Sequence, residues 1–472
     1  MILKKISLSV YIILLSFIFS VFVSHYNLEN FDRNVDTHGT IYHQMIKNDA
    51  YRYMSHGAEI KEDLKNGVNY FDTGRESYTK YLPPRIAAFY YYISDTELFN
   101  NFDEKKINIG VHFPYLFAQC LIYFFSIFFL YNSISKILDK RICLFIIFFL
   151  SLEPTIFQYH GSFLSESIFF SIQILLIALI FSEKQSLKNF FLVGFLLAIL
   201  SMQKQMAIFY IIPVAIYFIL FIKQARLKKI SFLLIGYIVV QFFLGYHNFY
   251  RSGEFYIMTA DTKIDVHRYL VVRVVPQKYE TTPQDWEKLE GKAMARWMDN
   301  NSISYDEKAL SSIINPNYME YRKSIINEND KVRFDNQLRS RTFNYLLKYP
   351  LDFLVAILKG SVHTALLNPF HIYSDHNFVS GETYYVSDTH DKLIPYRIFY
   401  TFLIYTICLF GLFSIIKEKN YSLLFYLTIS ILYFFGLVSW HGDTRYFVPV
   451  MIYLSFFFGA GLNKIINIRK ND

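Results

Sequence analysis

Long runs of apolar residues alternate with short polar stretches along the chain. A helix needs about 20 apolar residues to cross the hydrocarbon core, so a window of about 19 residues locates the candidate spans. The pattern predicts about ten of them: 6–24, 111–134, 142–158, 166–182, 188–202, 206–222, 230–247, 396–416, 421–439 and 446–463.

The composition agrees with this pattern. Of the 472 residues, 53% are hydrophobic and 18% charged, whereas globular domains carry about 25% charged residues. We therefore predict an all-α polytopic membrane protein. The three cysteines lie in apolar runs, so neither a disulfide framework nor a CxxC metal motif is indicated. The net charge of +8 comes mostly from short loops and does not indicate a nucleic-acid partner.

Clusters of Lys and Arg orient the spans, because they concentrate in short cytoplasmic loops. They flank the first, second, fourth, sixth, eighth and last runs, and with ten spans they all fall on one side. Both termini are predicted on this cytoplasmic side, as in a bacterial inner-membrane protein with its active site facing outward. The first span is expected to remain as an anchor, since "SVFVSHYN" lacks a small-x-small cleavage site.

Three regions follow from the spans. Residues 1–247 form an N-terminal transmembrane module with an outward loop at 25–110, and residues 396–472 form a C-terminal module. Between them, 248–395 is predicted to be a second outward region. Within it, 351–370 is expected to be a helix in or on the outer membrane surface, because a further span there would force the later "KEK" cluster outside.

The second outward region contains one clear helical pattern, "TTPQDWEKLEGKAMARWMDN". Thr282 suits the N-cap and Pro283 the first helical position. Residues at helical spacing share one face, which is expected to pack against the protein or the membrane surface: Trp286, Leu289, Ala293 and Trp297.

One acidic residue stands at the head of an apolar run. Glu166 lies in "YHGSFLSESIFFSIQILLIALIF", and an ionised carboxylate costs about 2.5–3.5 kcal/mol at the centre of a span, less near its end. The orientation places Glu166 at the outer end of its span. It either reaches water there or faces a polar site.

Polar residues from distant parts of the chain are predicted at the same outer level. Asp49 and Tyr53 share a helical face in "NDAYRYMSHGAEI", and Arg85 follows a proline pair in "KYLPPR". Lys204 lies between two glutamines on the outer side, against the positive-inside preference. Arg445 opens the last span. Each alone would fit a solvated side chain, but their shared depth predicts a site.

Such a site suits group transfer from a lipid-linked phosphate. Cations bind the phosphate and neutralise charge as it leaves. One carboxylate takes the proton of an incoming hydroxyl, and a second orients that base or helps to hold a divalent metal. No spacing specifies a metal site, so metal dependence is left open and no other cofactor is indicated.

The order of the motifs resembles the C-type (GT-C) membrane glycosyltransferases that use polyprenyl-phosphate sugars. This superfamily includes the protein O-mannosyltransferases and the aminoarabinose transferase of lipid A. The resemblance covers roughly residues 1–465 and is carried by seven segments in order: "DAYRY", "LPPR", "SLEPTIFQYHGSFLSESIFF", "GFLLAILSMQKQ", "YHNFYRSGEFYIMTAD", "YPLDFLVAILKG" and "RYFVPVMIYLSFFFGAGL".

The resemblance implies roles for individual residues. Asp49 corresponds to the first-loop catalytic acid and Glu166 to the second acidic position. Residues of the same segments are expected to bind the lipid phosphate or the sugar: Tyr53, Arg85, His160, Lys204, Arg251, Arg445 and Tyr446. Two departures stand out. Ala50 replaces the second acid of the mannosyltransferase dipeptide, and Lys204 replaces a frequent Arg, so that a bidentate fork cannot form.

The function predicted from these residues is that of an inverting hexosyl- or pentosyltransferase. It would move a sugar from a polyprenyl-phosphate donor to a hydroxyl of a lipid, glycan or protein acceptor on the outer face, among membrane lipids. One alternative is an O-antigen ligase or polymerase that uses diphosphate-linked glycans and depends on His267 or Arg268. The other is a transporter, for which Gln173 and Gln241 are modest signals.

Overall fold

The structure is a computed structural model that describes most of the chain. The described residues are 8–29, 49–73, 81–95, 109–182, 186–257, 266–311, 313–367, 388–438 and 446–471. Within these ranges the chain forms helices and no β-strand, apart from one isolated bridge between Tyr305 and Ile325. The predicted all-α membrane architecture is confirmed.

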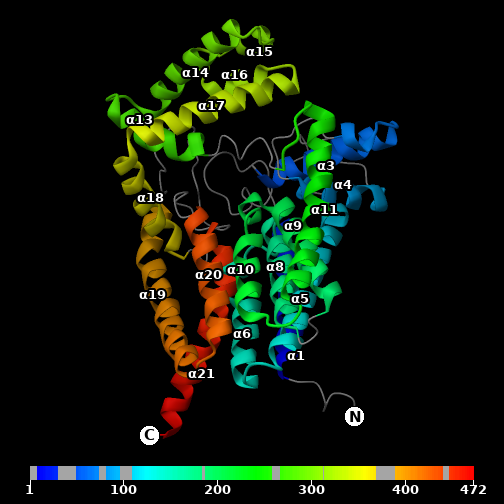
Figure 1. The fold of residues 1–472 in the computed structure, drawn as a ribbon, viewed down its shortest axis with the longest axis vertical. Coiled ribbons are helices and arrows are strands. Elements are labelled where there is room, and N and C mark those ends of the chain that lie inside the picture. Colours follow the sequence, from blue (N-terminus) through cyan, green and yellow to red (C-terminus); the bar gives the residue numbers. More distant parts are fainter. Residues whose placement is uncertain are drawn as a thin grey trace.

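A bundle of apolar helices forms the lower part of the molecule (Figure 1), and a helix overlaps each predicted span. These helices are α1 (Leu8–Glu29), α5 (Ile109–Ile134), α6 (Lys140–Leu152), α8 (Glu166–Ile180), α9 (Leu187–Gln203), α10 (Ile211–Phe221), α11 (Arg226–Ser252), α19 (Asp388–Lys417), α20 (Tyr421–Val438) and α21 (Val448–Asn471). In the described residues, five helices are long and apolar enough to cross a membrane: those holding Leu8–Tyr26, His112–Ile134, Arg226–Tyr250, Ile394–Lys417 and Val448–Asn467. The full number of crossings stays a prediction.

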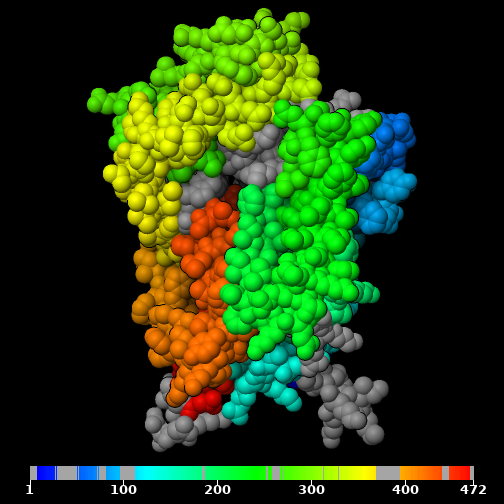
Figure 2. All heavy atoms as spheres, in the orientation of Figure 1, coloured from blue at the N-terminus to red at the C-terminus, as the bar shows by residue number. Residues whose placement is uncertain are grey.

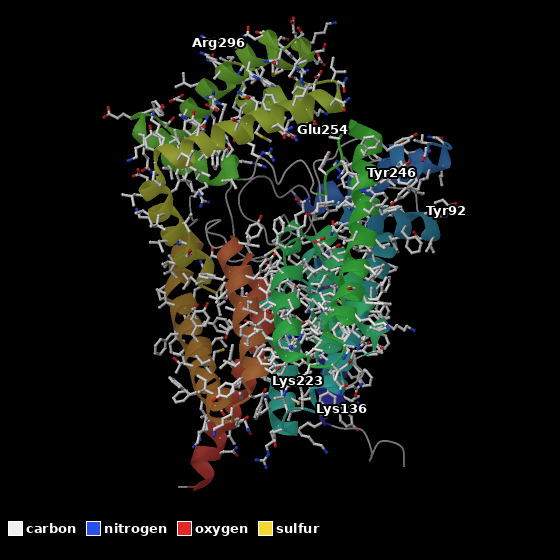
Figure 3. All side chains as sticks on the ribbon, viewed as in Figure 1. Tyr92, Lys136, Lys223, Tyr246, Glu254 and Arg296 are labelled. Atoms are coloured by element: carbon white, nitrogen blue, oxygen red, sulfur yellow. The ribbon has the colours of Figure 1, made fainter. Side chains whose placement is uncertain are left out.

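The basic loops and the outward regions lie at opposite ends of the bundle. Lys136 and Lys223 point away from its lower end in Figure 3, whereas Arg296 lies in the helical layer at the upper end. The start of α1 and the end of α21 also lie at the lower end (Figure 1). The short basic loops therefore lie at the end of the bundle opposite the outward regions, as the predicted orientation requires.

The third predicted span is shorter than the sequence suggested. α6 ends at Leu152, and Pro154 opens the separate short helix α7 (Pro154–Phe157). Glu153 stands at the junction in an extended conformation and accepts a 2.9 Å hydrogen bond from the Ile156 amide. A residue before proline avoids the helical region, so hydropathy alone misplaces this boundary.

Two glycines let α9 and α11 touch backbone to backbone. A Cβ atom on Gly194 would lie 1.9 Å from the Leu233 carbonyl oxygen, and one on Gly236 would lie 2.2 Å from that of Phe191. Helices in membranes commonly associate through small residues in this way.

We expect Gly194→Ala to destabilise the bundle by about 1–3 kcal/mol or more, because a methyl group there meets backbone that cannot swing away. Gly436→Ala is the matched control, since a Cβ on Gly436 meets no atom within 4 Å. Thermal unfolding in detergent measures both. Equal melting temperatures for the two variants would show that α9 and α11 are not packed this closely.

The first outward loop contains α3 (Asp49–Lys65), the short 3-10 helix η2 (Tyr70–Asp72) and α4 (Leu82–Ser94). α3 packs along α4, and η2 packs against α11. In Figure 1 this group lies beside the upper part of α11. The loop is therefore part of the outer end of the bundle.

The second outward region forms a helical layer above the bundle, which we call the outer layer (Figures 1 and 2). Its elements are η4 (His267–Val271), α13 (Val272–Lys278), α14 (Pro283–Asn300), α15 (Glu307–Ser311), α16 (Tyr318–Ser324) and α17 (Glu328–Lys348), and α18 (Pro350–Ala365) leads from it back to the bundle. Two small cores hold it together, one around Met294 and Phe334 and one around Val275 and Trp286.

The buried face of α14 differs from the predicted one. Trp286 is buried as expected, but Leu289 is 56% exposed, and Glu290 and Met294 are buried instead. Arg341 of α17 donates to both carboxylate oxygens of Glu290, which turns this polar residue inward. A buried charge is tolerated when it is paired, so apolar spacing alone placed the face incorrectly.

His267 is fully buried in the outer layer, where its Nδ1 lies 2.9 Å from Thr342 Oγ1. Burial lowers the pKa of His267 from 6.5 to about 4. The folded protein keeps the ring neutral, whereas the unfolded chain takes up a proton below about pH 6.5. The contribution of His267 to the free energy of unfolding is therefore complete above about pH 6.5. It is lost as the pH falls toward 4, by at most about 1.4 kcal/mol per pH unit.

We expect His267→Gln to flatten this dependence. Unfolding temperatures of wild type and variant at pH 7 and pH 4.5 measure it, and the wild type should lose more between the two values. An equal loss in both proteins would assign the acid sensitivity to other groups.

Candidate active site

A buried ion pair lies at the outer end of the bundle. Lys204 Nζ is 2.6 Å from Glu166 Oε1, and the two side chains are 3% and 0% exposed. Glu166 is the first residue of α8, and Lys204 directly follows the last residue of α9. Because α8 and α9 are packed antiparallel neighbours, the start of one meets the end of the other. Two residues predicted at this level are thus in direct contact.

Aromatic rings stand beside the cation of this pair. Lys204 Nζ is 5.7 Å from the ring centre of Phe169 and 5.8 Å from that of Tyr446. An ammonium group within about 6 Å of a ring is attracted to its face. Tyr446, which the sequence assigned to donor binding, therefore joins Glu166 and Lys204, and it brings the start of the last span to the same point.

The surroundings of the pair are polar. Gln203 Nε2 donates to the Ser165 carbonyl at 3.0 Å, which fixes the orientation of its amide. Gln203 Oε1 and Gln205 Oε1 are buried atoms without a hydrogen-bond partner among the described residues. A buried ion pair is poor evidence for stability, and unpartnered acceptors are costly. This combination indicates a site built for a ligand that carries charge and hydroxyl groups.

Arg85 lies in a separate cluster. Its Nη2 is 2.9 Å from His247 Nε2 of α11, its Nε donates to Tyr70, and its guanidinium stacks 3.7 Å from the Tyr81 ring centre. These described contacts tie α4 and η2 to α11. They do not bring Arg85 to Glu166, so its predicted role at the phosphate is not supported by contact.

The beginning of α3 is buried in the main apolar core. Ala50 and Met54 belong to the main apolar core, and Tyr53 is buried. Asp49 is the first residue of this helix. The Asp49 side chain lies outside the described residues, as do the side chain of Arg251, in the last turn of α11, and the whole of Arg445.

His160 is buried, and it contacts the first turn of α8. Its ring centre is 4.0 Å from that of Tyr123, and its Nδ1 lies 3.2 Å from Ser167 Oγ. Nε2 has no hydrogen-bond partner among the described residues. These contacts make His160 a positioning residue for the turn that leads into Glu166.

Glu153 is a buried carboxylate that the sequence analysis overlooked. It caps α7 through Ile156 N and accepts a hydrogen bond from Tyr400 of α19, which links the two halves of the bundle. The signal was present, because an acid before a proline at the outer end of a span is an N-cap pattern. The sequence analysis included Glu153 in a longer segment and gave it no role of its own.

A metal site is not evident in the described part of the chain. No three His, Cys, Asp or Glu residues group there as metal ligands would. The Asp49 side chain lies outside the described residues, so the divalent metal considered from the sequence stays a prediction.

One known protein family matches the part of the chain that contains this site. Residues 106–246, from α5 to α11, match the family described as dolichyl-phosphate-mannose-protein mannosyltransferase. The match supports the C-type membrane glycosyltransferase superfamily. The matched segment contains both Glu166 and Lys204, so the ion pair lies in the part of the chain that resembles the family. A sugar linked to a polyprenyl phosphate is the donor class that the family uses. No curated protein matches the chain significantly.

Proposed function

We propose that the protein transfers a hexose or pentose from a polyprenyl monophosphate to a hydroxyl group of a lipid, glycan or protein. The transfer would take place on the outer face of a bacterial inner membrane, with both termini in the cytoplasm. The observation that carries this proposal is the buried Glu166–Lys204 pair at the outer end of the matched segment.

The donor phosphate would bind at Lys204. This cation already lies at the outer end of the bundle, and its carboxylate partner can be exchanged for, or joined by, a phosphate oxygen. Arg445 precedes Tyr446, whose ring is beside Lys204, and would supply a second positive charge. The polyprenyl chain would lie along the apolar helices.

The transfer step would use Asp49 as the general base. Asp49 takes the proton of the acceptor hydroxyl while its oxygen forms a bond to the anomeric carbon from the face opposite the phosphate. The bond from this carbon to the phosphate oxygen breaks, and its electron pair leaves with the polyprenyl phosphate. Lys204 would stabilise the charge that develops there, and the anomeric configuration inverts.

The two unpartnered glutamine oxygens support a sugar as the bound group. Gln203 Oε1 and Gln205 Oε1 flank Lys204 in the sequence and can accept hydrogen bonds from hydroxyl groups. An apolar or purely anionic ligand would leave both acceptors unsatisfied.

The alternatives receive less support. The ligase interpretation relied on His267 or Arg268, and of these His267 is buried and kept neutral in the outer layer. The transporter interpretation relied on Gln173 and Gln241, whose amide groups donate within the bundle, to the Pro449 carbonyl and to Ser201.

Purified protein in lipid, supplied with a polyprenyl-monophosphate sugar and a mixture of hydroxyl acceptors, tests this function. We expect transfer or slow donor hydrolysis, with inverted configuration at the product anomeric carbon by NMR. Turnover of diphosphate-linked glycans, with none of the monophosphate donors, would establish the ligase or polymerase alternative. A product with retained configuration would exclude the single displacement.

A further inference from the structure

α18 exposes a continuous apolar stripe. Five residues spaced as one face of a helix are between 49% and 74% exposed: Leu351, Leu354, Val355, Leu358 and Val362. The opposite face is buried, with Phe353 in the same core as Trp286 of the outer layer. A stripe of this length on the surface requires a partner.

The lower end of α18 is fastened to α19. Tyr405 donates to the Ala365 carbonyl at 2.7 Å, and the Leu367 amide donates to Thr401 Oγ1 at 3.0 Å. Arg397 donates to the carbonyl oxygens of the two residues that follow α18, and its distance to that of Leu366 is 3.0 Å. Figure 1 shows α18 descending from the outer layer toward the upper ends of α19 and α20.

These contacts give the depth of the end of α18. α19 contains the candidate span Ile394–Lys417, with Lys417 at its cytoplasmic end. Thr401 lies 16 residues before Lys417, which corresponds to roughly 24 Å along a helix. The hydrocarbon core is about 30 Å thick, so Leu367, bonded to Thr401, lies about 6 Å inside its outer boundary.

The other end of α18 carries the features of a membrane interface. Lys348 lies 5.1 Å from the ring centre of Tyr349, and Lys278 forms a 2.7 Å ion pair with Asp352. Tyrosine and basic residues gather at the level of the lipid head groups. The helix is 16 residues long, or roughly 24 Å, which is enough to join this level to the acyl chains.

We propose that α18 inserts obliquely into the outer leaflet, with the lower part of its apolar stripe against phospholipid acyl chains and the upper part at the level of the head groups. The occupant of the stripe is the bilayer, because α18 ends against the candidate span of α19, on which Phe399 and Phe402 are also exposed. The buried face of α18 holds the outer layer, so the insertion fixes that layer at one height above the bundle. This inference does not depend on the proposed glycosyltransferase activity.

Spin-label accessibility in lipid vesicles tests the insertion. Val362→Cys and Leu351→Cys are labelled with a nitroxide, while Cys120, Cys143 and Cys408 are buried and resist the reagent. Phe402→Cys of α19 is the lipid-facing control and Ile326→Cys of the outer layer the water-facing control, since both side chains are about equally exposed. Size-exclusion profiles and melting temperatures confirm that each variant folds.

We expect the label at Val362 to collide with oxygen more than with a water-soluble nickel complex, with a ratio above that at Ile326 and somewhat below that at Phe402, because Val362 lies nearer the membrane surface. The label at Leu351 should lie closer to the water-facing control. A ratio at Val362 equal to that at Ile326 would place α18 above the membrane and overturn the proposal. Protection of Val362 from both reagents would also overturn it, because the stripe would then be covered by protein. Leu358→Cys repeats the measurement if Val362→Cys does not fold.

Discussion

Lys204→Met and Glu166→Gln are each expected to destabilise the protein by about 3–5 kcal/mol, because either change leaves one buried charge without its partner. The two side chains are almost fully buried and 2.6 Å apart, so water cannot replace the missing group. Thermal or denaturant unfolding of the purified variants measures the loss. Lys65→Met is the control, since Lys65 forms a similar 3.1 Å ion pair with Asp95 at an exposed position. Losses as small as that of the control would mean that the pair is not buried.

The exchange variant, Glu166→Lys with Lys204→Glu, separates stability from function. The ion pair can re-form with its charges reversed, so much of the stability lost in the single variants should return. Transfer should not return, because a carboxylate then stands where the donor phosphate needs a cation. A folded and active exchange variant would make the pair a purely structural element.

Asp49→Asn is expected to lower the transfer rate by about 10²–10⁴-fold, the usual contribution of a general base, without unfolding the protein. Asparagine keeps the size of the side chain but cannot accept the acceptor proton. Initial rates at saturating donor measure the effect, with Glu59→Gln of the same helix as control because Glu59 is exposed. Wild-type rates in Asp49→Asn would remove Asp49 from this role.

The sequence predicted at which end of the bundle the polar residues lie, but not which of their side chains are in contact. Apolar runs located the helices, and the basic loops put Glu166 and Lys204 at the same end. Their direct contact depends on the register between α8 and α9 across 38 residues, which hydropathy does not determine. Both were therefore expected to face the substrate, whereas the structure pairs them with each other.

The remaining differences also arise from polar contacts. Arg85 was placed by its level with the other cations, and its described partners include Tyr81 and His247, which the sequence pattern did not indicate. Glu290 turns inward on α14 because Arg341, 51 residues away, supplies its partner. Periodicity weighs apolar residues alone, so a paired charge in a core is outside what it can predict.

The most direct test of the central claim is sugar transfer from a labelled polyprenyl-monophosphate donor by wild type and the exchange variant in parallel. We predict transfer by the wild type and a rate at least about 10²-fold lower in the folded exchange variant, in which the cation and the carboxylate have changed places. Equal rates in the two proteins, or no transfer from any monophosphate donor, would contradict a phosphate-binding site at Lys204.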